Sequence, residues 1–312
     1  MRSSVVITIL SLFAAIIICG CKQRSDQDRP DAETEIREYL AGKSARIGVA
    51  VINPDDAADT IMINAGEDFP MMSVFKFPLA LALAEWLDRQ GSSLADSVDV
   101  GEAELREDTW SPMLKMYGKR PLRLTYREVL EWSLKESDNN ACDVLIDRIG
   151  GTTAVSGILD SLGVGDEIRV KVTEAQMHVD PSLSLKNSST PRAMARLFER
   201  YDSELRDRSA NFREIGGMLE QCRTGLDRLP APFEGSDAII GHKTGTGFAT
   251  AGGGISAIND CGYIIIPDGA RYYIAVFISN SPDSPDDTSK IIAEISEIVK
   301  SHFTSSNLNK ED

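Results

Sequence analysis

The pattern of apolar and polar positions divides this chain into strand-forming ends and a helical middle. Alternating positions rich in Val and Ile predict two strands, over 46–53 and 60–64, which form a hairpin. Three further strands are expected near the C-terminus, over 238–244, 253–266 and 271–279. An irregularity is expected in the second of these, at 260–262, and a Pro-Asp-Gly turn at 267–269 joins the last two.

Apolar residues spaced three or four positions apart predict amphipathic helices in the rest of the chain. Two of these helices, over 31–43 and 288–303, flank the strands. The helices expected in the middle of the chain cover 73–90, 125–135, 140–149, 153–162, 191–201 and 211–222.

This order of elements predicts an α+β fold, an α/β sandwich in which a five-stranded antiparallel sheet is flanked by helices and carries an inserted all-helical lobe. We assign 31–66 and 230–312 to the sheet lobe and 67–229 to the helical lobe. A cleft between two such lobes is where a ligand site is expected.

The first thirty residues have a different character. Arg2 precedes an apolar run over 5–18, which is shorter than the about 20 residues of a membrane span and typical of a signal peptide. The run ends in Cys-Gly-Cys, which resembles a bacterial lipoprotein box. We therefore expect a signal peptide at 1–20, a lipid on Cys21, a tether at 21–30 and a periplasmic domain at 31–312 on a bacterial membrane. Cleavage near Gly20 without a lipid is the alternative.

Charge and cysteine content exclude some classes of function. The chain has 33 Lys and Arg against 48 Asp and Glu, and nucleic acid is not expected as a partner because phosphate binding needs clustered basic residues. Cys142, Cys222 and Cys261 lack the spacing of metal ligands, so we interpret them as buried small residues, with one disulfide as the alternative. His242 is interpreted as an ordinary flanking residue and His302 as a solvated helix end.

The helix expected at 73–90 begins on Ser73 and has Lys76 one turn later, on the same face. A serine beside a base is a nucleophile, and the unpaired N–H groups of a helix N-terminus favour an oxygen that gains negative charge. Composition predicts about one Ser-x-x-Lys by chance in a chain of this length. Alone, the motif is also typical of a helix cap with a solvated lysine.

Two later motifs also admit two interpretations. Ser137, Asp138 and Asn139 lie between two expected helices, where they supply either an N-cap or a second hydroxyl and an amide. Lys243 and Thr244 follow a short strand, where they bind a carboxylate or belong to an exposed strand that ends in a glycine turn. In the first case the glycine at 245 lets a substrate backbone come close.

Ser-x-x-Lys, Ser-Asp-Asn and Lys-Thr-Gly in this order resemble the serine penicillin-binding proteins and class A β-lactamases. The stretch over 170–189 has no clear periodicity and resembles the Ω loop of class A enzymes, with Glu174 as its glutamate. His178 stands where most members have asparagine. The run over 174–178 and the run over 108–112 are similar to those of the extended-spectrum PER and VEB kinds of class A enzyme. Trp110, in the second run, would lie at the cleft mouth.

The resemblance implies a catalytic role for five residues. Ser73 would be the acylated nucleophile and Lys76 its proton partner, and Ser137 would pass a proton to the departing ring nitrogen. Glu174 would be the general base for deacylation, while the base for acylation stays open between Lys76 and Glu174. The backbone N–H groups of Ser73 and Thr246 would form the oxyanion hole.

The resemblance also implies a set of substrate-binding residues. Asn139 would hold the side-chain amide of the substrate, and Lys243 and Thr244 would bind its carboxylate with help from Arg228. Trp110 and His178 complete the set, and the histidine would hold the loop differently from asparagine. No cofactor or metal is expected, because Glu174 and His178 are too few ligands.

We therefore expect a monomeric enzyme that hydrolyses the amide of β-lactams, preferably cephalosporins, through a serine ester and so gives β-lactam resistance. A penicillin-binding DD-peptidase is the nearest alternative, but it should lack the Ω-loop glutamate. A non-enzymatic lipoprotein that binds peptidoglycan or a protein partner through the same cleft is the third.

Overall fold

The computed structural model describes residues 31–267 and 270–308. The expected signal peptide, the tether with Cys21 and the turn residues 268–269 lie outside the described residues. Among the described helices, none has the length and apolar character needed to cross a membrane.

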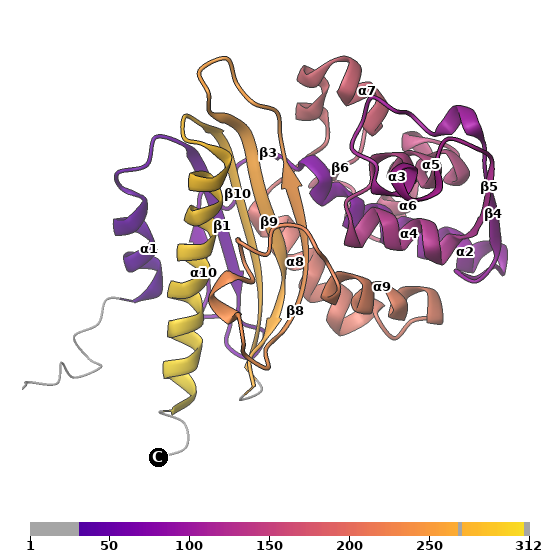
Figure 1. Cartoon of the computed structure of the whole chain (residues 1–312). Helices are drawn as coiled ribbons and strands as arrows, with labels where there is room; N and C mark the ends of the chain where they lie inside the picture. Colours follow the sequence, from indigo (N-terminus) through magenta and orange to yellow (C-terminus); the bar gives the residue numbers. More distant parts are fainter. Residues whose placement is uncertain (1–30, 268–269, 309–312) are drawn as a thin grey trace, which may run out of the picture.

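Both ends of the chain enter one antiparallel sheet, as the strand pattern predicts (Figure 1). The strand order is β2-β1-β10-β9-β8. β1 and β10, the first and last strands in the sequence, are therefore neighbours inside the sheet. β1 pairs with β10 from Arg46–Ser279 to Ile52–Tyr273. The bounds are β1 Arg46–Ile52, β2 Ile61–Ile63, β8 Ile239–Thr246, β9 Ile255–Ile265 and β10 Arg271–Ser281.

The irregularity expected at 260–262 is wrong. β9 pairs with β10 without interruption through these three residues. A Cβ on Gly262 would meet the carbonyl oxygen of Gly241 at 2.3 Å. The glycine therefore serves the close approach of β8 to β9 rather than a bulge.

The two faces of the sheet pack against different helices. Along β10, Tyr273, Ala275 and Phe277 belong to the core shared with the helical region, while Ile274 and Val276 face the opposite core. Because successive side chains of a strand point to opposite faces, one strand supplies both cores. Helices α1 (Ala32–Leu40) and α10 (Pro285–Leu308) cover one face, and α8 (Pro191–Arg200) covers the other (Figure 1).

The helical region surrounds α2, whose residues from Phe77 to Ala84 are all at most 1% exposed apart from Pro78, which is also buried. A helix that is apolar all round is buried on all sides. The helices of this region are α2 Lys76–Gln90, α3 Pro112–Tyr117, α4 Tyr126–Lys135, α5 Asn139–Ile149, α6 Thr152–Ser161, α7 Glu174–Val179 and α9 Ala210–Glu220.

Five short strands were not predicted from the sequence. They form a β4–β5 pair and a three-stranded sheet in the order β3-β7-β6. Strands of two to four residues contain too few alternations to give a pattern. Their bounds are β3 Phe69–Pro70, β4 Ser97–Val100, β5 Leu122–Thr125, β6 Ile168–Arg169 and β7 Ser188–Ser189.

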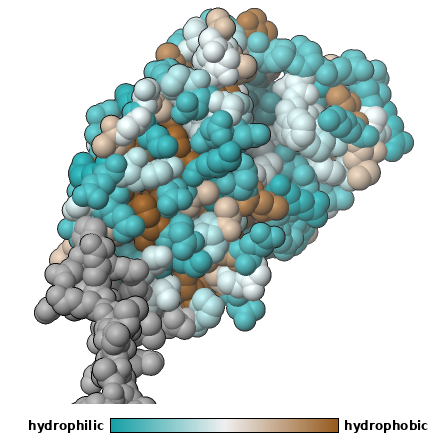
Figure 2. All heavy atoms as spheres, turned by 60° about the vertical axis from the view of Figure 1, so that its left-hand side comes forward, coloured by the Kyte–Doolittle hydropathy of each residue, from teal (hydrophilic) through white to brown (hydrophobic). Residues whose placement is uncertain are grey.

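The side of the molecule that carries α1 and α10 is mostly hydrophilic (Figure 2). Apolar side chains appear on this face in small groups between hydrophilic ones. This distribution agrees with the net charge of −15, which favours a well-solvated surface.

Candidate active site

Ser73 lies in a 3₁₀ turn, Met72–Phe75, that leads into α2. The prediction that the α-helix begins on Ser73 is therefore wrong, because α2 begins at Lys76. Met72 has φ 47°, a left-handed conformation that costs a non-glycine residue of order 1–3 kcal/mol. The turn places the Ser73 hydroxyl beside the side chain of Lys76, at 3.0 Å from Nζ.

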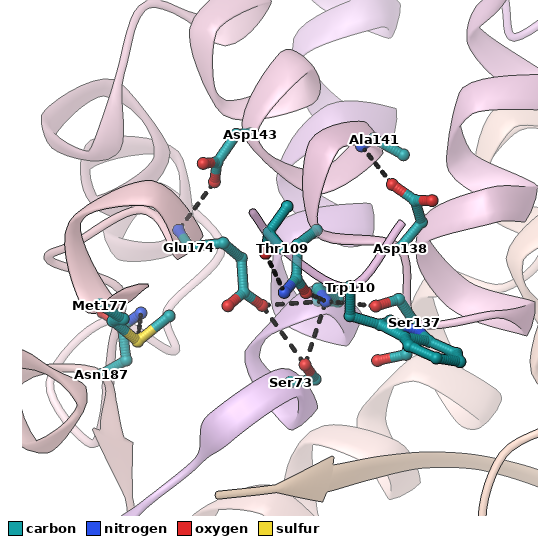
Figure 3. A network of polar contacts seen from close by, with 12 residues as sticks. Ser73, Thr109, Trp110, Ser137, Asp138, Ala141, Asp143, Glu174, Met177 and Asn187 are labelled. Atoms are coloured by element: carbon teal, nitrogen blue, oxygen red, sulfur yellow. Dashed lines mark hydrogen bonds and ion pairs between the residues drawn. The ribbon is translucent and has the colours of Figure 1, made fainter. Parts of the chain in front are cut away.

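The Lys76 ammonium is completely buried and has four oxygen neighbours. It lies 2.9 Å from Glu174 Oε1, and it donates to the carbonyl of Ser137 at 2.8 Å and to Asn139 Oδ1 at 2.7 Å. Ser73 Oγ is in turn 3.3 Å from Glu174 Oε1 (Figure 3). Both candidate bases thus reach the serine, and the carboxylate offsets the buried positive charge.

Glu174 is the first residue of α7, inside the stretch predicted to be an Ω loop. Its N–H and that of Ala175 donate to the two carboxylate oxygens of Asp143, each at 2.8 Å. The Asn187 side chain accepts from the N–H of Val172 and donates to its carbonyl, which closes the base of the loop. Glu174 therefore sits on a loop that is fastened at both ends.

The sequence interpretation missed Asp143. It lies four residues after Asn139, so the spacing places both on one face of α5 and could have revealed it. Burial raises the pKa of Asp143 to about 6. The stretch 170–189 is also more ordered than expected, since it contains α7 and a 3₁₀ turn at Pro181–Lys186, both too short to show periodicity.

Both interpretations of the Ser-Asp-Asn motif hold. Asp138 caps α5 by accepting from the Ala141 N–H at 2.9 Å, and its other oxygen accepts from Ser111 and Met113. Ser137 has φ 57°, a left-handed conformation, and both Ser137 and Asn139 line the cavity described below. The Ser137 hydroxyl accepts from Lys243 Nζ at 3.0 Å.

Lys243 lies on β8 and is completely buried, so the alternative of an exposed strand is wrong. Burial lowers the pKa of this lysine to about 8. The role expected for Gly245 is also corrected: a Cβ there would meet the carbonyl oxygen of Met71 at 2.5 Å. The close approach that needs glycine is between β8 and the turn that carries the nucleophile.

Two further side chains support the outer end of β8. Thr244 Oγ1 is 2.5 Å from Thr224 Oγ1. The buried Arg228 donates to Thr246 Oγ1 at 2.8 Å and to the carbonyls of Gly245 and Asn259 at 3.2 and 3.1 Å. Arg228 therefore holds the strand end and reaches the cavity through Thr246.

These side chains surround a cavity of about 470 Å³. Trp110 is 54% exposed at the cavity, and its indole donates to the carbonyl of Glu136 at 3.0 Å. His178 does not line the cavity, because its imidazole lies at the surface 3.4 Å from Asp108. The lining residues from the predicted set are Ser73, Trp110, Ser137, Asn139, Glu174, Arg228, Thr244 and Thr246.

Comparison with known proteins identifies the family. Residues 31–303 match the β-lactamase enzyme family. A class A β-lactamase from Bacteroides cellulosilyticus is 33% identical, with a TM-score of 0.82 over 88% of this chain and 98% of that one. The chain belongs to the class A β-lactamases.

Two relatives of this β-lactamase come from Pseudomonas aeruginosa. β-Lactamase VEB-1 is 33% identical over 96% of this chain and 97% of its own. Extended-spectrum β-lactamase PER-1 is 32% identical over 86% of each chain. The resemblance inferred from the Glu174 and Trp110 segments is thus confirmed, and the DD-peptidase and non-enzymatic alternatives are set aside.

The two remaining histidine interpretations are wrong. His242 is buried, and its Nδ1 lies 2.9 Å from Asp260 Oδ1, because β9 places a buried carboxylate beside it. His302 lies 2.7 Å from Asp59 rather than free in solvent. Among the residues that the structure describes, no cluster of His, Cys, Asp and Glu is placed to hold a metal ion.

The three described cysteines are free thiols, so the alternative of a disulfide among them is wrong. Cys142 and Cys261 are completely buried among apolar residues, as expected. Cys222 differs from them, because polar side chains surround it.

Proposed function

We propose that Ser73 of this β-lactamase attacks the β-lactam carbonyl to form an ester, which a water activated by Glu174 hydrolyses. The position of the Ser73 hydroxyl, 3.0 Å from Lys76 Nζ and 3.3 Å from Glu174 Oε1, carries this proposal. A nucleophile with a proton acceptor in hydrogen-bond reach is the arrangement that acyl transfer needs. As the ester forms, the Ser73 proton passes to the general base, either Glu174 or a neutral Lys76. Ring opening breaks the C–N bond, and the nitrogen takes the proton of Ser137, which Lys243 replaces from 3.0 Å.

The remaining residues of the predicted set bind the substrate. Lys243 and Thr244 bind its carboxylate, and Arg228 supports them through Thr246. Asn139 holds the side-chain amide of the substrate, and Trp110 bounds the cavity mouth. The N–H groups of Ser73 and Thr246 stabilise the oxyanion, which in acyl transfer is worth about 10²- to 10³-fold per donor.

Binding is expected to weaken as the pH rises through about 8, where Lys243 loses its charge. KM for a carboxylate-bearing β-lactam, measured from pH 6 to 10, should therefore rise on the alkaline side. Folding should not weaken in that window, because burial lowers the pKa of Lys243 and deprotonation then favours the folded state.

The matched control for this prediction is Lys243→Arg, which keeps its charge throughout that range. Its KM should show no comparable rise. A rise of equal size in Lys243→Arg would assign the pH dependence to another group.

We propose cephalosporins as preferred substrates. PER-1, which is named an extended-spectrum enzyme, supports this preference, as does the resemblance of the Glu174–His178 run to that kind of enzyme. Turnover of a chromogenic cephalosporin by the purified protein tests it, with a penicillin compared at equal concentration. Sustained turnover with a higher kcat/KM for the cephalosporin is expected. Faster penicillin hydrolysis would refute the preference and leave the hydrolytic mechanism intact.

We further propose that a lipid on Cys21 anchors the enzyme to a bacterial membrane, with the enzyme in the periplasm. The apolar run that ends in Cys-Gly-Cys supports this. Cys21→Ser should move the protein from the membrane fraction to the soluble periplasm without loss of specific activity, as measured by fractionation. Cys19→Ser is the matched control and should stay on the membrane. Retention of Cys21→Ser there would refute the anchor.

The enzyme is proposed to act as a monomer. Ser73, Lys76 and Glu174 contact one another within the chain, so the proposed chemistry needs no side chain from a second copy. A single species with the mass of one chain is expected in size-exclusion chromatography, and a dimer at assay concentration would contradict it.

A further inference from the structure

A cluster of thiol, imidazole and carboxylate lies behind the end of β8 and takes no part in the roles proposed above. His242 Nδ1 is 2.9 and 3.1 Å from the two carboxylate oxygens of Asp260. The Cys222 thiol lies close enough to His242 for each group to shift the pKa of the other, and its sulfur is 3.4 Å from Thr224 Oγ1. Cys222 is 7% exposed, His242 2% and Asp260 completely buried. The order carboxylate, imidazole, thiol is one that activates a cysteine.

The charges in this cluster favour a thiolate paired with an imidazolium. Burial opposes the charge on His242, but Asp260 and Cys222 raise its pKa above the ordinary value. Burial likewise opposes the thiolate of Cys222, while His242 and Lys243 lower its pKa. The guanidinium of Arg228 also interacts with this thiol, and its positive charge favours the anion.

The cluster touches the active site through two hydroxyl groups. Cys222 Sγ lies 3.4 Å from Thr224 Oγ1, which lies 2.5 Å from Thr244 Oγ1. Both threonines line the cavity. The sulfur is therefore one hydroxyl away from the space where the substrate carboxylate is proposed to bind.

We propose that Cys222 is a modification site for hydrogen peroxide, and that its oxidation displaces Thr224 and Thr244 and weakens substrate binding. The thiolate attacks one oxygen of the peroxide, so that an S–O bond forms as the O–O bond breaks. Sulfur loses two electrons, and the departing hydroxide takes a proton from the His242 imidazolium to leave as water. The products are a sulfenic acid and neutral histidine.

The space around the sulfur explains why this product disturbs the site. At 3.4 Å, Cys222 Sγ and Thr224 Oγ1 are already in contact, and no oxygen atom fits between them. The ion pair is also lost, because sulfenic acid is neutral at this stage and histidine has given up its proton. Lys243, which the thiolate charge supports, then loses a nearby anion.

Peptide mapping tests the site directly and requires no substrate, so its result is independent of the proposed function. The purified full chain is treated with limiting peroxide, which is then removed, and the protein is unfolded in dimedone to trap sulfenic acid. We expect the adduct on the Cys222 peptide. Cys142 and Cys261 are internal controls, because burial raises the pKa of each well above its ordinary value. Equal labelling of all three would overturn the proposal.

Activity measurements test the consequence. Peroxide should raise KM and leave kcat less affected, and dithiothreitol should restore the parent value. Oxidised methionine is not reversed by dithiothreitol, which separates the effect from the nine methionines of the chain. During peroxide treatment, Cys222→Ser should lose activity about tenfold more slowly than the parent enzyme. The control Cys142→Ser should lose activity at the parent rate. Loss from Cys222→Ser at the parent rate would refute the link to binding.

The thiolate itself is observable without any reagent. At neutral pH the parent and Cys142→Ser should show thiolate absorbance in the ultraviolet, and Cys222→Ser or Cys222→Ala should lack it. This readout stands even if one variant folds poorly, since two substitutions are compared. An unchanged absorbance in both would show that Cys222 is not the anionic thiol.

Discussion

Glu174→Gln is expected to trap the enzyme as an ester on Ser73. Acylation keeps the Ser73–Lys76 contact of 3.0 Å, whereas hydrolysis of the ester needs a water stripped of its proton, which a neutral amide cannot take. Loss of a general base costs about 10²- to 10⁴-fold, and the loss should fall on deacylation. Intact mass should show an adduct within seconds, and the product burst should equal the enzyme concentration.

Glu167→Gln makes the same chemical change at an exposed position and should behave like the parent enzyme. The measurement also informs the choice of base for acylation. A fast burst in Glu174→Gln shows that Lys76 suffices for that step, and a slow burst assigns it to Glu174. Sustained turnover near the parent rate would remove Glu174 from deacylation altogether.

Ser73→Ala is expected to abolish both turnover and covalent labelling. No other Ser-x-x-Lys occurs in the sequence, and no other described serine hydroxyl contacts both Lys76 and Glu174. Removing the nucleophile of a comparable hydrolase costs on the order of 10⁶-fold in kcat. Intact mass after incubation with a cephalosporin should show unmodified protein.

Ser137→Ala distinguishes the role of the nucleophile, proposed for Ser73, from the role of the proton donor, proposed for Ser137. This variant keeps Ser73 and should still acquire the adduct, though slowly, because the departing nitrogen has lost its nearest hydroxyl. Labelling of Ser73→Ala at Ser137, located by peptide mass, would reverse the two assignments.

Sequence patterns predicted the elements that bury long regular faces. Four strands of the main sheet and helices such as α8 were placed within a few residues, because each repeats its apolar period several times. The three-residue β2 was located by the turn that precedes it. The six-residue α7 and the two-residue β3 offer no such repetition. The start of α2 was misplaced because its first turn is 3₁₀, a distinction that apolar spacing does not carry.

Motifs identified most of the predicted residues that line the cavity. Contacts between residues far apart in the sequence were not predicted. His242 was interpreted as an ordinary flanking residue because its partner Asp260 is 18 residues away in the sequence. The two become neighbours only through the β8–β9 register. His178 was included among the binding residues through its position in the loop, yet α7 turns its side chain toward Asp108 at the surface. Such pairings depend on tertiary geometry that local spacing cannot supply.

The pairing of β1 with β10 sets a condition on when the molecule folds. Arg46 and Ser279 are 233 residues apart and meet in adjacent strands. A long closure of this kind must be completed before its contacts contribute, which makes folding slow and places it late. The centre of the sheet therefore cannot form until nearly all of the polypeptide has been synthesised. A chain that stays unfolded until its last strand appears remains extended for the whole of its synthesis, and it can be passed through a narrow pore during that time.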